Sequence, residues 1–376
     1  MSEQSPAVTP DTSSAPGTTP GTTAPGTTMR AVGLRRCLPV TDPESLVDVE
    51  LPRPEVGPRD LLVEVRAVSV NPVDTKVRSG AIPDDRADER PDGVRVLGYD
   101  AAGVVVEVGS EVELFAVGDE VYYAGHLMRQ GSDAELHAVD ERLVGRKPST
   151  LGFAEAAALP LTAITAWEGL FDKLRLHEAS QGTLLLPGAA GGVGSMVLQL
   201  VRELLPGVRV VATASRAESR AWVEQLGAAA VVDHRADDLL DQVRLAAPDG
   251  VAWVFTSRVE QPGQLELYTE VLDPFGEIVA IDDPEVLDIA ALKPKSLSVH
   301  WELMFTRALT GGEQQRSQHD LLDRVADLVD AGRVRSTATT VLSPLDAATL
   351  RRAHGLVEDG HVVGKVVVAA AGEVPA

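Results

Sequence analysis

One stretch in the middle of the chain, residues 184–195, limits the possible folds more than any other part of the sequence. Its letters are LLLPGAAGGVGS: an apolar run, a glycine-rich turn, and the start of a segment with apolar residues at helical spacing. Glycines let the backbone approach a pyrophosphate closely, and the free amides at a helix start stabilise its charge. The stretch therefore predicts a dinucleotide site made by Gly188, Ala190, Gly191, Gly192, Val193 and Gly194.

The sequence around this stretch predicts an α/β protein. In residues 151–289, short apolar runs alternate with helical periods, which is typical of βαβ units and a doubly wound parallel sheet. Residues 29–150 show strand-like alternation between Pro and Gly turns, which predicts a mostly β domain. From residue 290 to 376 the chain leaves the βαβ pattern. Residues 1–28 are rich in Pro, Gly, Ser and Thr and predict a disordered low-complexity tail.

Charge and cysteine content exclude several classes of function. The 376-residue chain has a formal net charge of −22, which repels nucleic acid and anionic lipid surfaces. No stretch reaches the roughly 18 apolar residues of a membrane span. Cys37 is the only cysteine, so an intrachain disulfide or a zinc site made of cysteines is excluded, and a reducing cytoplasm is expected.

The second strand of this βαβ unit follows the turn and its helix, and the residues at its end indicate which dinucleotide is bound. A site that prefers NAD usually carries Asp or Glu about 20 residues past the turn. Here the strand runs into Ser215 and Arg216, with no carboxylate in that place. A hydroxyl and a guanidinium suit a 2′-phosphate, so we expect NADPH, with Arg220 able to share the role.

Several longer motifs give the chain a family resemblance. They are residues 69–78 (SVNPVDTKVR), 97–100 (LGYD), 189–194 (AAGGVG), 212–216 (ATASR), 295–307 (KSLSVHWELMFTR) and 325–332 (VADLVDAG). With them the sequence resembles the medium-chain dehydrogenase/reductase superfamily, in particular its quinone oxidoreductase-like branch. The resemblance implies a GroES-like catalytic domain formed by residues 29–150 and completed by 290–376, and a Rossmann NADP-binding domain over 151–289. It also implies a nicotinamide in the cleft between them and a homodimer formed through the edges of the Rossmann sheets.

Zinc members of this superfamily hold the metal through residue types that are missing at the corresponding positions of this sequence. Asn71, Tyr99 and Leu161 stand where the resemblance places the ligands. None of these side chains supplies a thiolate or an imidazole, so we expect no metal site.

The expected chemistry is therefore hydride transfer from NADPH to a quinone or an α,β-unsaturated carbonyl compound. The Asn71 amide and the Tyr99 phenol would stabilise the oxygen that becomes negative, and Asp74 would orient its neighbours. The proton would come from solvent or from Tyr99. Either Thr162 or Thr165 would bond the nicotinamide carboxamide.

Two rival functions remain open from the sequence. One is a zinc-dependent alcohol dehydrogenase, and the other is a non-catalytic NADPH-binding redox sensor. The residues do not identify the physiological substrate.

Overall fold

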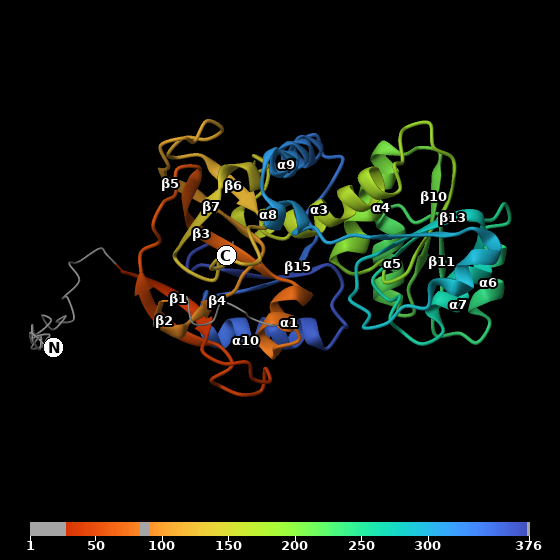
Figure 1. Cartoon of the computed structure of the whole chain (residues 1–376), viewed down its shortest axis with the longest axis horizontal. Coiled ribbons are helices and arrows are strands. Elements are labelled where there is room, and N and C mark those ends of the chain that lie inside the picture. Colours follow the sequence, from red (N-terminus) through yellow and green to blue (C-terminus); the bar gives the residue numbers. More distant parts are fainter. Residues whose placement is uncertain (1–27, 83–90, 374–376) are drawn as a thin grey trace, which may run out of the picture.

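The structure is a computed structural model that describes residues 28–82 and 91–373. The predicted tail therefore lies almost wholly outside the described residues. Two parts lie side by side in Figure 1, one with a parallel sheet on the right and one with antiparallel strands on the left.

The right-hand part contains a six-stranded parallel sheet. Its strand order is β11-β10-β9-β12-β13-β14, the order of a dinucleotide-binding doubly wound sheet. The strands are β9 (Gly182–Leu186), β10 (Val208–Thr213), β11 (Ala230–Val232), β12 (Val251–Thr256), β13 (Leu272–Ala280) and β14 (Ser298–Trp301). The connecting helices are α4 (Gly192–Leu204), α5 (Ala217–Leu226), α6 (Leu239–Ala246), α7 (Gln264–Val271) and η5 (Ile289–Lys295).

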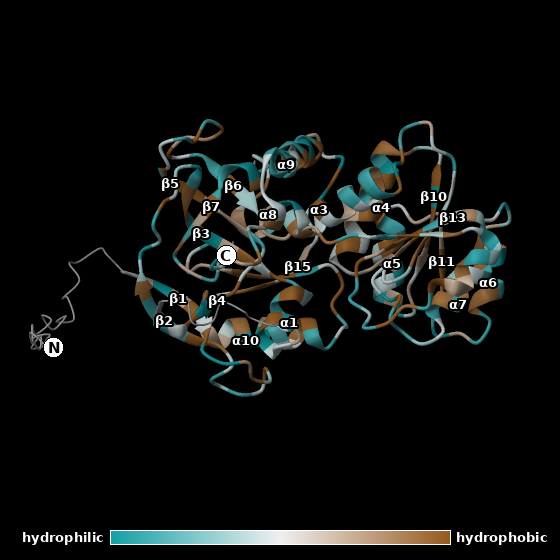
Figure 2. Ribbon diagram, viewed as in Figure 1, coloured by the Kyte–Doolittle hydropathy of each residue, from teal (hydrophilic) through white to brown (hydrophobic). Residues whose placement is uncertain are grey.

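This sheet is apolar on both faces, which is why its strands read as continuous apolar runs. Leu184 and Leu186 of β9 pack in one core with Val197 of α4, while Leu185 packs in the opposite core with Val243 of α6. Parallel sheets are buried on both faces by their crossover helices. Figure 2 shows the resulting brown strands at the centre of this part.

The left-hand part is built on a seven-stranded sheet. Its path is β15-β16-β3-β5-β6-β8, with β7 also paired to β3, and its pairs are antiparallel except β15 with β16. The strands are β3 (Asp60–Val70), β5 (Ala101–Val108), β6 (Glu120–Tyr123), β7 (Leu136–Asp140), β8 (Val144–Arg146), β15 (Ala338–Leu342) and β16 (Lys365–Ala369). A smaller sheet contains β1 (Thr28–Leu34), β2 (Val47–Pro52) and β4 (Arg95–Val96). The C-terminal strand β16 thus joins a sheet formed mostly by the first part of the chain.

Helices surround this sheet and lead toward the parallel one. They are α1 (Pro72–Ser79), η2 (Pro91–Gly93), η3 (Glu141–Leu143), α2 (Phe153–Ala156), α3 (Pro160–Trp167), the π-helical η4 (Glu168–Lys173), α8 (Thr306–Thr310), η6 (Glu313–Gln315), α9 (Arg316–Asp330) and α10 (Ala347–Glu358). The chain crosses to the parallel sheet through α3 and η4, and it returns after β14 through α8 and α9. Helix α3 links both crossing segments to the glycine-rich turn, because it packs against α4, the helix that follows the turn, and against α9.

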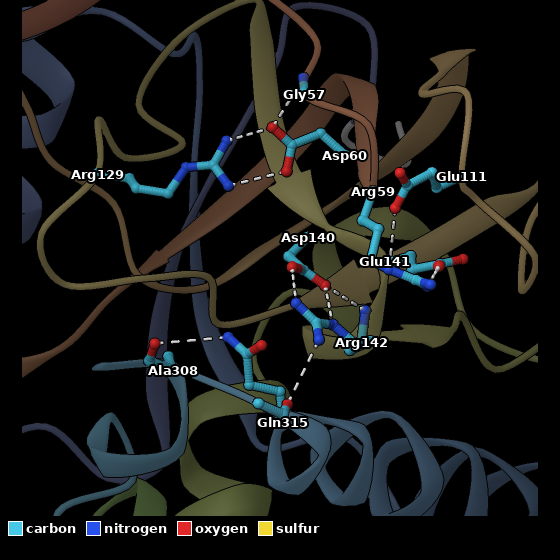
Figure 3. Close-up of polar contacts among 11 residues, drawn as sticks. Gly57, Arg59, Asp60, Glu111, Arg129, Asp140, Glu141, Arg142, Ala308 and Gln315 are labelled. Atoms are coloured by element: carbon cyan, nitrogen blue, oxygen red, sulfur yellow. Dashed lines mark hydrogen bonds and ion pairs between the residues drawn. The ribbon is translucent and has the colours of Figure 1, made fainter. Parts of the chain in front are cut away.

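Figure 3 shows ion pairs on the left-hand part and a hydrogen bond from one of their arginines to the returning segment. Asp60 pairs with Arg129 at 2.7 Å, and Asp140 pairs with Arg142 at 2.6 Å. The Arg142 guanidinium also donates to the backbone oxygen of Gly312, at 3.4 Å. Of these contacts, the one from Arg142 links helix η3 to the 308–315 segment.

The predicted fold class is confirmed, with a GroES-like β part and a Rossmann-type parallel sheet. The expected boundary at residue 289 falls inside the parallel layer, because β14 pairs with β13 between Glu277 and Trp301. The helical spacing of residues 290–295 and the short strand after them resemble the preceding units, which the sequence interpretation overlooked. Within the described residues, no helix is long and apolar enough to cross a membrane.

Candidate functional site

Asn71 stands at the junction of β3 and α1. Pro72 occupies the first turn of α1, and the backbone of Asn71 is extended (φ −120°, ψ 162°), as the residue before a proline prefers. The Asp74 carboxylate accepts hydrogen bonds from the backbone N–H of Asn71, at 2.7 Å, and of Gly98, at 3.1 Å. Asp74 therefore ties the start of α1 to the LGYD turn.

A buried triad of Asn71, Asp100 and Lys365 lies next to this junction. The Lys365 ammonium is 2.9 Å from Asp100 Oδ2 and also donates to Asn71 Oδ1. Asn71 Nδ2 donates to Asp100 Oδ2 at 2.9 Å and to the Ser69 carbonyl at 3.2 Å. Both N–H groups of the Asn71 amide are thus engaged with protein partners, so the amide positions Asp100 and Lys365.

Asp100 also reaches the first interdomain helix. Its Oδ1 accepts the backbone N–H of Leu161, at the start of α3, at 2.7 Å. Every partner of this carboxylate is a donor, an arrangement that suits the ionised form. Burial raises the pKa of Asp100, and the Lys365 ammonium and these donors oppose that effect.

Burial acts on Asp74 as well. It raises the pKa of this carboxyl to about 7, although the two backbone N–H groups and the charge of Lys365 lower it. Asp74 has no contact with the cavity described next, which fits the orienting role expected for it.

A cavity of about 620 Å³ runs from Asn71 past the glycine-rich turn to the end of β10. The turn residues predicted for the dinucleotide all line it: Gly188, Ala190, Gly191, Gly192, Val193 and Gly194. Helix α4 begins at Gly192, so its free N–H groups face this space. Anionic groups such as a pyrophosphate are stabilised at such a helix start.

The two ends of the cavity carry further predicted residues. Asn71 and Thr162 line one end, and Ser215 and Arg216 line the other. The Thr162 hydroxyl donates to the Leu159 carbonyl at 3.0 Å, so its oxygen can still accept a hydrogen bond.

Besides Asp74, three of the predicted binding or catalytic residues lie away from the cavity. Thr165 does not line it, and its hydroxyl donates to the Leu161 carbonyl within the helix, at 2.8 Å. The Arg220 guanidinium donates to the carbonyls of Ala214 and Val231, both at 3.1 Å. Arg220 therefore braces the backbone after β10.

Tyr99 is the third of these residues. Its side chain is fully buried, its hydroxyl accepts a hydrogen bond from Arg95 at 3.1 Å, and its ring packs edge-on against Phe305. The neighbouring Asp100 does not line the cavity either, but its carboxylate accepts a hydrogen bond from Lys365, which does.

The structure adds residues that sequence reasoning missed. Lys365 lines the cavity, and its stem lies so close to Gly192 that a Cβ there would be 2.7 Å from Lys365 Cδ. The signal was a single lysine inside the apolar run VVGKVVV at residues 362–368. At the other end, His234, Arg235 and Arg258 join Arg216 in lining the cavity, and the three guanidinium groups concentrate positive charge there.

The residues in the place of zinc ligands do not suit a zinc ion. The carboxamide of Asn71 is bonded to an ammonium group, Tyr99 is turned toward Arg95, and Leu161 offers only its backbone. Across residues 28–82 and 91–373, no group of three His, Cys, Asp or Glu side chains could hold a metal ion.

Comparisons with known proteins agree with the fold. One family model, an alcohol dehydrogenase GroES-like domain, matches residues 57–169, and another, a zinc-binding dehydrogenase, matches residues 226–368. A zinc-type alcohol dehydrogenase-like protein of Staphylococcus epidermidis is 33% identical over 347 residues, covering 90% of this chain and 99% of its own length. The chain belongs to the medium-chain dehydrogenase/reductase superfamily.

Two further members of the superfamily are informative. A protein of Rhizobium etli CFN 42, provisionally named a zinc-dependent alcohol dehydrogenase, has a solved structure with a TM-score of 0.84 and 46% identity, covering 92% of this chain and 99% of that one. The chloroplastic NADPH-dependent alkenal/one oxidoreductase of Arabidopsis thaliana is 33% identical over 321 residues, 84% of this chain and 73% of the relative. The superfamily makes this chain an oxidoreductase with a nicotinamide cofactor.

Proposed function

We propose that the protein reduces α,β-unsaturated carbonyl compounds or quinones with NADPH and without a catalytic metal. The observation that carries the proposal is the Asn71–Asp100–Lys365 triad, in which an internal ammonium stands beside the position expected for a zinc ligand. The similarity to an alkenal/one oxidoreductase supports the substrate class.

Each part of the cavity has a task in this proposal. The glycine-rich turn and the start of α4 hold the pyrophosphate, and Thr162 accepts from the nicotinamide carboxamide. Bound NADPH supplies the hydride. Lys365 keeps an N–H beyond its two partners and stabilises negative charge brought into this end of the cavity.

The proton for the reduced substrate comes from solvent in this account. Tyr99 is fully buried, and it does not line the cavity. Asn71 and Asp74 act as positioning residues that hold Lys365 and the LGYD turn in place.

The functional experiment measures steady-state rates in both directions. An enone and a 1,4-quinone are tested with NADPH and with NADH, and simple alcohols are tested with the oxidised cofactors. We expect NADPH oxidation with the enone or the quinone. Turnover confined to alcohols would favour the rival dehydrogenase function, whereas tight NADPH binding with no turnover would favour the redox sensor.

The choice of NADPH makes a separate prediction about Arg216. Its side chain lines the cavity and donates to the His361 carbonyl at 2.7 Å, so the guanidinium is held near the end of β10. Arg216→Asp should raise the Kd of NADPH at least about tenfold, because a carboxylate repels the 2′-phosphate, and should spare NADH. Arg220→Met is the matched control, since Arg220 binds backbone carbonyls outside the cavity. An equal effect of both variants on the NADPH to NADH ratio would refute the assignment.

Two further expectations, on the oligomeric state and on the cellular compartment, also belong to the proposal. A homodimer would form at β14, the edge strand of the parallel sheet, where Trp301 is 49% exposed. We also expect the protein to act in the cytoplasm, since a single cysteine suits a reducing compartment.

A further inference from the structure

A second buried acidic group lies where the two crossover segments meet, outside the cavity. Glu168 is the first residue of η4, and Glu302 follows β14. Their exposures are only 3% and 5%. Isolated carboxylates in such surroundings are costly unless they are paired or protonated.

The partners of Glu168 come from the returning segment. Arg307 of α8 lies 3.2 Å from Glu168 Oε1, and Gln318 of α9 donates to the same oxygen at 3.2 Å. Arg307 also pairs with Asp172 of η4 at 2.7 Å, and Gln318 donates to the Met304 carbonyl at 2.6 Å. Glu168 is therefore supplied with a charge and a donor that suit its ionised form.

Glu302 is differently placed. Within the described residues, no N–H or hydroxyl group donates a hydrogen bond to either of its oxygens, and the nearest cation, the Lys173 ammonium, is 3.5 Å away. The Glu302 carboxyl can bond to Glu168 only if it carries a proton and donates it. Like charges held together in a dry site cannot both be ionised at low cost.

We propose that Glu168 and Glu302 share one proton, and that this proton holds together the two segments by which the chain crosses between the layers. The charged groups that face the pair are Arg307, Lys173 and Asp172. Loss of the proton places two negative charges between η4 and α8, and the segments separate.

The pH dependence follows from Glu302. Burial, and then the charge of Glu168, raise its pKa to about 8 from the usual 4.5. Between these values the folded protein holds a proton that the unfolded chain has lost, so stability falls as pH rises from about 4.5 to 8 and then levels off.

The test compares the thermal unfolding temperature of wild type and Glu302→Gln between pH 5 and 9. The glutamine is neutral at every pH, and its amide can donate to Glu168 in place of the proton. We expect similar values at pH 5 and an advantage of about 5–10 °C for the variant at pH 8.5. Parallel curves for the two proteins would overturn the proposal.

Glu168→Gln provides the matched variant. It removes the negative charge that holds the proton on Glu302, so the pH-dependent fall in stability should end at a lower pH than in wild type. An unchanged end point would show that the two carboxyl groups are not coupled, which also overturns the proposal.

The junction should also affect the cavity, a step that rests on the proposed function. Helix α3 runs directly into Glu168 and carries Leu161 and Thr162 into the cavity. We expect the Kd of NADPH to rise at least threefold from pH 7 to 9.5 in wild type, and less in Glu302→Gln. Equal rises in both proteins would refute this coupling. NADPH binding at no pH would refute the proposed cofactor while leaving the unfolding test of the pair intact.

Discussion

Asp100→Ala is expected to lower the free energy of unfolding by about 3–5 kcal/mol, because it leaves the buried Lys365 ammonium without its counter-charge. It also removes the acceptor for the Leu161 N–H, so the start of α3 loses its tie to the LGYD turn. The kcat/KM for NADPH-dependent reduction should fall roughly 100-fold, since misplacement of cavity groups is costly for the reaction. Denaturant unfolding and steady-state kinetics measure the two effects.

Two comparisons isolate the buried pair. The double variant Asp100→Ala/Lys365→Met should be more stable than Asp100→Ala alone, because no charge is then stranded. Asp283→Asn removes the acid of an exposed ion pair with Lys76, whose atoms are 2.6 Å apart, and should cost less than about 1 kcal/mol. If the stability loss of the double variant equalled the sum of the losses in Asp100→Ala and Lys365→Met, the described triad would be contradicted.

Gly194→Val should abolish dinucleotide binding and lower the unfolding temperature. A Cβ at this position would lie 2.6 Å from the Cα and carbonyl oxygen of Ala189. Both are backbone atoms, so the turn itself would have to move. The dissociation constant of NADPH from a fluorescence titration and the thermal unfolding temperature measure the effect.

Gly191→Ala separates the two consequences. Its Cβ would be 3.5 Å from the Gly188 carbonyl oxygen, an ordinary contact, and its φ of −75° suits any residue. Since Gly191 lines the cavity, the added methyl should weaken NADPH binding with little change in stability. If Gly194→Val bound NADPH as wild type does, the turn would not be the cofactor site.

The fold could be predicted from the sequence because its determinants are local. Continuous apolar runs, glycine turns and helical periods identified the βαβ units, and Leu184, Leu185 and Leu186 pack on alternating faces as a buried strand requires. The residues of the glycine-rich turn line the cavity together because they lie within a dozen residues of each other in the chain.

The interior of the site depended on contacts that local patterns cannot show. Lys365 reaches Asn71 from a position 294 residues away in the chain, and only the pairing of β16 with β3 brings them together. A family correspondence places Tyr99 near the centre of the site, yet its side chain direction depends on packing against Arg95 and Phe305. Likewise, the sequence shows that Arg220 is near Arg216 but not that backbone carbonyls occupy its guanidinium.

The central claim is reduction by NADPH without a catalytic metal, and one measurement tests it most directly. The initial rate of NADPH oxidation with an α,β-unsaturated ketone is recorded before and after dialysis against a strong chelator, with the zinc content determined in both samples. We predict equal rates and a zinc content far below one ion per chain. A rate that disappears on chelation and returns with added zinc would contradict the account.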